Sequence, residues 1–489
     1  MLESLLSAGM DVARLNFSHG THQAHAHVIC TLRELSLKMG KPLALLQDLS
    51  GPKVRLGTFM TPSVMLRRGQ IVGFVASETS GDGASAGYHT AFDAAGTAAP
   101  GCLLLPLPVP QMLDALTPGR QLLLDDGKIA LKVTACAGAP GSPERTVWAR
   151  VIVGGELKPH KGVAAPGVVF DVPAVTEKDI DDLRFGLAHG VDWVAASYVR
   201  YADDLEPLRA VMREVGITVP LIAKIEKFEA VENLESILDA CDGAMVARGD
   251  LGVEMPVEEV AVTQKRIIRA CNRKGKPVIT ATQMLDSMIR NPRPTRAEVT
   301  DITNAVFDGT DAVMLSGETA AGAYPMEAVQ MMSRIAEFAE GAIDYAHVLD
   351  EKHLEHGARA SVTDAIGEAV ATIATEQHAQ AILCSTTSGN TARTVSKFRP
   401  QTRILAATTE ETTYRAMALY WGVEPMLVPF PRDTDAMIAQ TVEAATRFGH
   451  VHDGDRVVIT AGTPLGVPGS TNLIKVHIIG QPLTTPPAP

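Results

Sequence analysis

Polar and charged side chains follow a series of short apolar runs, each at the point where its run ends. The residues in these positions are Asn16 and Ser18, Asp48, Ser197, Lys224 and Glu226, Arg248 and Asp250, Thr280 and Thr282, and Ser316 and Glu318. Successive strands that carry chemistry at their C-terminal ends are typical of the active site of a (β/α)8 barrel. A doubly wound sheet would instead concentrate such residues at one switch point.

Two carboxylates stand at the ends of adjacent expected strands. Glu226 follows one apolar run and Asp250 follows the next. Carboxylate oxygens are the hard ligands that Mg²⁺ takes in proteins. From spacing alone, a metal site and a pair of solvated loop acids are equally supported.

Lys224 lies two residues before Glu226. Residues i and i+2 of a strand point to one face, so the ammonium is expected beside the carboxylate. There it could neutralise a developing negative charge. The alternative is a lid-facing or surface lysine. An unpaired lysine at the top of a buried strand would be costly, which favours a function.

The apolar runs predict seven strands that alternate with helices. The strands are expected at residues 12–17, 43–48, 193–197, 221–225, 244–247, 277–280 and 312–315, and helices at 179–188, 257–273 and 297–307. Thr295 and Glu298 form a capping-box pattern before the last of these helices. The alternation favours a parallel α/β domain. Runs that are apolar on both faces indicate strands buried on both sides.

This alternation is interrupted between about Val54 and Pro159. Here strand-like stretches at 71–75, 121–124 and 147–153 are joined by turn residues, with Asp126-Gly127 as a hairpin turn. We interpret the stretch as an all-β insertion. A second α/β series begins near Arg359, with strands expected at 381–384, 403–407, 425–428, 456–460 and 473–479.

Composition excludes several classes of protein. The 489 residues hold 44 Lys and Arg against 56 Asp and Glu, a net charge of −12, which argues against a nucleic-acid binder. The six cysteines form no CxxC pair, as expected of a reducing compartment. Apolar runs stay short of a membrane span. The start, Met1–Leu6, lacks the basic region of a secretion signal.

Several longer motifs resemble those of the pyruvate kinase family. They are DVARLNFSHG (11–20), KIE (224–226), ARGDLG (247–252), ATQML (281–285), NAV (304–306), MLSGET (314–319) and TNLIKV (471–476). They occur in the family's order over essentially the whole chain. The resemblance implies a phosphotransferase that moves the phosphoryl group of phosphoenolpyruvate to ADP, giving pyruvate and ATP in the last step of glycolysis.

The resemblance also implies a domain organisation. Residues 1–52 and 160–345 would form a (β/α)8 TIM-type barrel, residues 53–159 an inserted β-rich lid, and residues 346–483 an α/β regulatory domain. Residues 484–489 would be a loose tail. Members of the family begin with a strand that would precede Met1. We therefore expect the first of the eight barrel strands to be missing.

By the same resemblance, Glu226 and Asp250 hold Mg²⁺ or Mn²⁺, and Lys224 neutralises the phosphoryl group in flight. Arg14 binds phosphate on the substrate and nucleotide sides. Gly249 opens a short helix whose N–H groups face the substrate carboxylate.

Thr282 resembles the threonine that is linked to protonation of the enolate. A hydroxyl is a poor acid near neutral pH, so we expect a relay through water. Arg248 either lines the rim of the site or orders its loop, and Ser316 and Glu318 either lie near the nucleotide or begin a helix.

A pocket for a monovalent cation would be formed by Asn16, Ser18 and Asp48. Members that require K⁺ carry Glu where this chain has Lys53. The lysine ammonium could replace the cation, so we expect activity without K⁺.

The resemblance places Arg14, His19, Arg55 and Lys161 at the nucleotide, with the lid excluding water. The alternative for Lys161 is a hinge lysine in solvent. His19 belongs to a histidine cluster that continues through His27, which we interpret as solvated helix residues rather than a metal site.

A phosphorylated allosteric effector would bind the C-terminal domain. The loop of Thr386, Thr387, Ser388, Gly389, Asn390 and Thr391 follows a strand and precedes a helix, as in a phosphate cradle. A glycine-rich loop at 461–469 would complete the site. Fructose 1,6-bisphosphate, a sugar monophosphate and AMP all remain open. The family implies a cytoplasmic homotetramer that binds no membrane.

Two alternatives remain. One is a truncated, catalytically impaired member that keeps effector binding. The other is a barrel aldolase that uses pyruvate or phosphoenolpyruvate, which explains neither the lid nor the Ser/Thr-rich loop.

Overall fold

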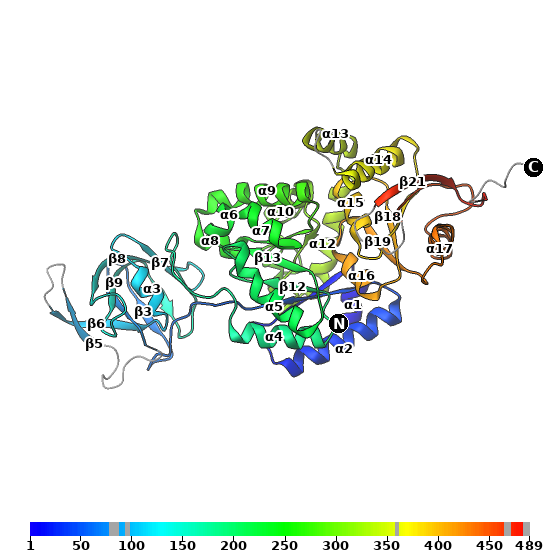
Figure 1. The fold of residues 1–489 in the computed structure, drawn as a ribbon. Helices are drawn as coiled ribbons and strands as arrows, with labels where there is room; N and C mark the ends of the chain where they lie inside the picture. Colours follow the sequence, from blue (N-terminus) through cyan, green and yellow to red (C-terminus); the bar gives the residue numbers. More distant parts are fainter. Residues whose placement is uncertain (78–87, 93–97, 357–360, 464–470, 483–489) are drawn as a thin grey trace, which may run out of the picture.

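The structure is a computed structural model that describes residues 1–77, 88–92, 98–356, 361–463 and 471–482 (Figure 1). The expected tail 484–489 and residues 464–469 of the expected glycine-rich loop lie outside these residues. Three parts follow one another along the long axis of the molecule. A β domain lies at one end, a barrel-type α/β domain in the middle, and a second α/β domain at the other end.

The central domain is built on a seven-stranded sheet with the order β1-β2-β12-β13-β14-β15-β16. All six neighbouring pairs are parallel. The strands are β1 (Val12–Asn16), β2 (Ala44–Asp48), β12 (Trp193–Ala196), β13 (Leu221–Ile225), β14 (Gly243–Ala247), β15 (Val278–Ala281) and β16 (Ala312–Val313). The predicted barrel with seven visible strands is confirmed. β16 ends two residues earlier than expected because, among the described residues, it pairs with β15 alone.

Helices cover the outside of this sheet. They are α1 (Leu2–Ser7), α2 (His22–Met39), α4 (Glu177–Ala188), α5 (Glu206–Val215), α6 (Phe228–Glu232), α7 (Leu234–Ala240), α8 (Arg248–Glu254), α9 (Val257–Lys274), α10 (Arg296–Phe307), α11 (Gly317–Ala320) and α12 (Pro325–Glu340), with the 3-10 turns η2 (Ala202–Leu205) and η3 (Asp286–Ile289). The predicted Thr295–Glu298 capping box begins α10, and a second box, Thr176 with Asp179, begins α4. α1 contacts both α2 and α12, so helices from the two ends of the sheet order meet in the outer layer.

The inserted domain consists mainly of antiparallel strands. These are β3 (Val64–Leu66), β4 (Ile71–Val75), β5 (Tyr88–Phe92), β6 (Ala98–Pro106), β7 (Gln121–Leu124), β8 (Ile129–Ala137), β9 (Thr146–Val153), β10 (Gly155–Leu157) and β11 (Val163–Ala164). It also carries one short helix, α3 (Pro110–Ala115), which the sequence analysis did not anticipate. The predicted hairpin turn joins β7 to β8, with Asp126 and Gly127 at φ +56° and +83°.

The C-terminal domain has a five-stranded sheet with the order β19-β18-β17-β20-β21. Its elements are α13 (Tyr345–His356), α14 (Val362–Glu376), β17 (Ala381–Ser385), α15 (Asn390–Lys397), β18 (Ile404–Thr408), α16 (Glu411–Ala416), η5 (Met417–Leu419), β19 (Val423–Leu427), α17 (Thr434–Arg447), β20 (Arg456–Gly462) and β21 (Thr471–Ile478). The five strands expected here are all present, with ends shifted by one or two residues.

The C-terminal domain closes one end of the barrel interior. Leu419 of η5 is buried in the same apolar cluster as Trp193, Met245 and Ile279. The Trp193 indole donates to the carbonyl of Ala416 at 3.1 Å. These contacts lie at the N-terminal ends of the strands. The active site is therefore expected at the opposite end of the barrel, at the C-terminal ends of the strands.

Candidate active site

Lys224 lies at the centre of a polar cluster at the C-terminal ends of the strands. It is the fourth residue of β13 and its side chain is buried. Its Nζ donates to Ser197 Oγ at 2.6 Å and lies 3.3 Å from Asp48 Oδ1 and 3.6 Å from Glu226 Oε2. Burial alone would lower the pKa of this ammonium, but the carboxylates of Glu226, Asp48 and Asp250 outweigh that effect and raise it. Lys224 is therefore held as a cation.

Asp48, the last residue of β2, joins two cations. Arg14 of β1 donates from Nε to Asp48 Oδ2 at 2.6 Å, while Lys224 faces the other oxygen. The carboxylate is fully buried, which opposes ionisation, yet Lys224 and Arg14 together hold the pKa of Asp48 below its usual value. The structure thus brings Asp48, which was predicted for the monovalent-cation pocket, together with Arg14, Lys224 and Glu226, which were predicted for the substrate and the metal.

Glu226 and Asp250 face one another, as the sequence predicted. Burial and the negative charge of Glu226 raise the pKa of Asp250 to about 7. The backbone N–H of Tyr198 donates to Glu226 Oε1 at 2.5 Å and so orients that carboxylate. In the described part of the chain no three His, Cys, Asp or Glu side chains converge as a complete metal cage. Two adjacent carboxylates nevertheless fit Mg²⁺, which takes one or two protein carboxylates and completes its shell with water and substrate phosphate.

A buried ion pair connects the elements that carry these two carboxylates. Lys227 follows Glu226, Glu254 ends the helix that carries Asp250, and their Nζ and Oε1 lie 2.5 Å apart. The Lys227 ammonium also lies 4.4 Å from the centre of the Tyr198 ring. The sequence analysis missed this pair, because the two residues are 27 positions apart and no local pattern links them.

Thr282 and Gly249 are in direct contact. The Gly249 N–H donates to Thr282 Oγ1 at 2.7 Å, and the hydroxyl donates to the carbonyl of Ala281 at 2.6 Å. Thr282 has φ +70°, a strained conformation for a β-branched residue. Arg248 donates to the carbonyls of Ala281 and Thr282 at 3.2 and 2.7 Å. Of the two roles considered for Arg248, these contacts favour ordering of the loop.

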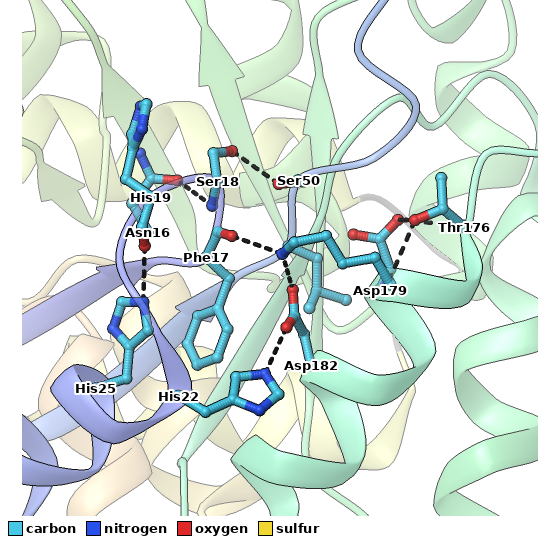
Figure 2. A network of polar contacts seen from close by, with 12 residues as sticks. Asn16, Phe17, Ser18, His19, His22, His25, Ser50, Thr176, Asp179 and Asp182 are labelled. Carbon is cyan, nitrogen blue, oxygen red and sulfur yellow. Dashed lines mark hydrogen bonds and ion pairs between the residues drawn. The ribbon is translucent and has the colours of Figure 1, made fainter.

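The loop after β1 lies beside the segment that leads into the β domain (Figure 2). Asn16 Oδ1 accepts from the Ser18 N–H at 3.1 Å, and Ser50 Oγ donates to Ser18 Oγ at 3.0 Å. The backbone carbonyl of His19 bonds to His25 Nε2 at 2.9 Å. The ring of His25 stacks on Phe17 with centres 4.1 Å apart, so it is a packing residue.

Three of the residues expected near the nucleotide and the monovalent cation, Lys53, Arg55 and Lys161, lie along the connection to the β domain. Burial and the charge of Lys224 lower the pKa of Lys53, against the attraction of Asp250 and Glu226. Lys161 pairs with Asp125 of the β7–β8 turn at 2.7 Å. Arg55 donates to the carbonyl of His160 at 2.9 Å. The charges of the Lys224 cluster therefore act on Lys53, whereas Lys161 and Arg55 bond to residues of the β domain and its connection.

The Glu318 side chain accepts hydrogen bonds from the backbone around it. It is buried and accepts from the N–H groups of Ser316 at 2.7 Å and Leu285 at 3.1 Å. These contacts favour the helix-start interpretation of Ser316 and Glu318.

The expected effector loop lies between β17 and α15, as predicted. Gly389 has φ +80° and precedes the first residue of the helix, Asn390. Thr391 Oγ1 lies 2.9 Å from Thr471 Oγ1, while Thr387 and Ser388 are exposed. Thr386 stays joined to the sheet through its N–H, which donates to the carbonyl of Ala407.

Comparison with known proteins covers nearly the whole chain. A family profile described as "Pyruvate kinase, barrel domain" matches residues 1–329, and one described as "Pyruvate kinase, alpha/beta domain" matches residues 364–477. The chain is 45% identical over 481 residues to a pyruvate kinase of Geobacillus stearothermophilus and 44% identical over 483 residues to one of Sporosarcina psychrophila. In both cases the match spans 98% of this chain and 78% of the relative.

Proposed function

This chain belongs to the pyruvate kinase family, and we propose that it transfers the phosphoryl group of phosphoenolpyruvate to ADP, giving pyruvate and ATP. The observation that most supports this is the buried Lys224 ammonium, held among Asp48, Glu226 and Ser197. Phosphoryl transfer depends on positioning and charge neutralisation more than on covalent chemistry. A cation fixed in a water-poor site provides both.

In this proposal Glu226 and Asp250 hold Mg²⁺ or Mn²⁺. The bound metal would supply charge neutralisation to the oxygens of the substrate. Arg14 and Lys224 bind the phosphoryl group from the other side, and both are fixed by Asp48. The N–H groups at the start of α8, with Gly249 and Asp250, receive the substrate carboxylate, which would replace Thr282 Oγ1 as the acceptor of the Gly249 N–H.

Thr282 takes part in protonation of the enolate through a water molecule. Its hydroxyl proton is engaged by the Ala281 carbonyl, so direct donation would break a 2.6 Å hydrogen bond. Ketonisation of enolpyruvate should slow in a Thr282→Ala variant. An unchanged rate for that step would reject the role.

Lys53 replaces a monovalent cation in the region of Asn16, Ser18 and Asp48. Its electrostatic coupling to Glu226 and Asp250 supports a charge-supplying role. We propose that K⁺ is not required. The β domain closes over the nucleotide, with Arg14, His19, Arg55 and Lys161 on that side.

The loop of residues 386–391 binds a phosphorylated effector through its exposed hydroxyls and the N–H groups at the start of α15. The division into residues 1–52 with 160–345, 53–159, 346–483 and 484–489 also belongs to this proposal. So do a homotetrameric assembly and a cytoplasmic location. No helix in the described part of the chain has the length and apolar character needed to cross a membrane.

The direct test is pyruvate formation by the purified chain from phosphoenolpyruvate, ADP and Mg²⁺, with and without a chelator and at fixed ionic strength with and without K⁺. Fructose 1,6-bisphosphate, a hexose monophosphate and AMP are then added separately. Chelator-sensitive pyruvate formation supports the assignment. A folded chain that binds an effector but forms no pyruvate would instead support the catalytically impaired alternative.

A further inference from the structure

Two stretches of chain connect the β domain to the barrel, and they run side by side. The outgoing stretch follows Gly51, and the returning stretch passes through residues 160–176 into α4. The Leu56 N–H donates to the Lys161 carbonyl at 2.9 Å, and the Val163 N–H donates to the Val54 carbonyl at 3.0 Å. The two stretches therefore form one paired connection. Contacts that limit a movement of the β domain must act where this connection meets the barrel.

One buried carboxylate holds both stretches at that point. Asp179, in the first turn of α4, is 1% exposed. Its Oδ2 accepts from the Thr176 N–H at 2.9 Å and from the Thr176 hydroxyl at 2.6 Å, and the Asp179 N–H donates to Thr176 Oγ1 at 3.2 Å, which completes the capping box. Its Oδ1 accepts from the Gly51 N–H at 3.1 Å, across 128 positions of sequence. A capping box uses one side-chain oxygen, so the second is free for this long-range contact.

The backbone conformation and the close surroundings of Gly51 both favour glycine at this position. It has φ +63°, and a Cβ atom on it would lie 3.0 Å from the Cβ of Ser197. The neighbouring Ser50 bonds to Ser18 of the loop after β1. The residue next to Gly51 thus contacts the loop that carries Asn16, Ser18 and His19.

The same turn of α4 also holds that loop (Figure 2). Lys178 Nζ donates to the carbonyl of Phe17 at 2.8 Å and pairs with the buried Asp182 at 2.5 Å. Asp182 in turn pairs with His22, on the helix that follows the loop, at 2.7 Å. Adjacent residues of one helix therefore fix the β-domain connection and the loop after β1.

We propose that Asp179 is a positioning residue that anchors the barrel side of the β-domain hinge and keeps it in register with the Asn16–His19 loop. This rests on the proposed function, in which the β domain closes over a nucleoside diphosphate held beside that loop. Asp179 is not among the residues that we assign to the substrate or the metal. It acts through the Gly51 N–H.

The test compares Asp179→Ala with Thr176→Val as the matched control. Each variant breaks the capping box by losing one of its two side-chain acceptors, and only Asp179→Ala also loses the acceptor of the Gly51 N–H. Hydrogen exchange followed by mass spectrometry should show exchange about tenfold faster in a peptide spanning residues 49–57 of Asp179→Ala, as expected for one lost hydrogen bond to a charged group. The same peptide of Thr176→Val should stay within about twofold of the parent chain.

Kinetics give a second readout. The KM for ADP should rise about fivefold or more in Asp179→Ala relative to Thr176→Val, while the KM for phosphoenolpyruvate changes less, because the lost bond orients the lid rather than the barrel site. Lys178→Met, which leaves the cap intact, should also raise the KM for ADP by loosening the loop.

Equal exchange and equal KM values in the two capping variants would overturn the proposal. If Asp179→Ala does not fold, Asp179→Leu, which fills the buried site and also lacks an acceptor for the Gly51 N–H, should give the same faster exchange, and a rate equal to that of Thr176→Val would overturn the proposal. A parent chain without pyruvate formation would reject the proposed function, while the exchange experiment would still decide the role of Asp179.

Discussion

Asp48 and Lys224 lie 3.3 Å apart, carboxylate oxygen to ammonium nitrogen, at the ends of β2 and β13, which are separated by β12 in the sheet. Arg14 of β1 reaches the same carboxylate from the other side at 2.6 Å. One buried anion thus holds two cations that come from opposite sides of it. This contact reaches across the intervening strand β12 and sets the spacing of the positive charges that we assign to the phosphoryl group.

Replacing Lys224 by Met should lower kcat by roughly 10²–10³-fold, because a fixed cation is removed from a site where negative charge moves. Lys276→Met is the control. Lys276 is also partly buried in the barrel, but it is bonded to the carbonyls of Leu238 and Cys241, away from the ends of the strands. Steady-state kinetics with both variants check the prediction. An equal loss of kcat in both would show that the effect is structural.

Asp48→Asn should destabilise the fold by about 3–5 kcal/mol, because it leaves the Arg14 and Lys224 cations without their shared anion in a buried site. Asp11→Asn is the matched control, since Asp11 pairs with Lys41 at 3.2 Å but is 62% exposed, and its loss should cost less than about 1 kcal/mol. Urea unfolding of both variants gives the comparison. A cost for Asp48→Asn as small as that for Asp11→Asn would contradict the assignment of Asp48 as the central anion.

The parent chain should keep its rate when K⁺ is replaced by a large organic cation at fixed ionic strength. Lys53→Glu should make the rate depend on K⁺, because it removes a cation near Glu226 and Asp250 and adds an anion. Lys132→Glu, which makes the same charge change at an exposed position of β8, should leave the chain independent of K⁺. A parent chain that already needs K⁺ would exclude the proposed role of Lys53.

The affinity for Mn²⁺ should fall as the pH falls below about 7. The pKa of Asp250 is raised to about 7 by burial and by Glu226, so below that pH the carboxyl is protonated, and the proton competes with the metal. The dissociation constant, followed by electron paramagnetic resonance of free Mn²⁺, should rise by up to about tenfold per pH unit there. Asp250→Asn should bind Mn²⁺ weakly and without this pH dependence. A parent chain with a flat profile between pH 6 and 8 would refute the assignment of Asp250.

Local patterns predicted most of the scaffold. Leu221–Ile225 is apolar at nearly every position, and so short a run is typical of a strand buried on both faces, so β13 has the bounds that were expected. The Thr295–Glu298 pattern likewise marks the start of α10, because a capping box satisfies N–H groups within one turn of helix. The box at Thr176 and Asp179 was overlooked, although the same spacing would have revealed it.

The partners of individual side chains could not be read from local patterns. Lys161, expected beside the nucleotide, pairs with Asp125, and His25 stacks on Phe17. Lys227 and Glu254 are 27 positions apart and meet only because β13 and α8 end beside one another. Such contacts depend on how distant segments are brought together, which periodicity and spacing do not encode.

The sequence by itself determined the strand ends and the chemical groups placed there, because apolar runs, caps and turns act over a few residues. It thereby determined that Lys224, Glu226 and Asp250 share one end of a parallel sheet. Only the tertiary structure decided that Asp48 would join Arg14 to Lys224 and that Asp179 would reach Gly51. These contacts form only after the sheet has curled and the β-domain connection has returned to the barrel, so their geometry belongs to the whole fold and to no single segment.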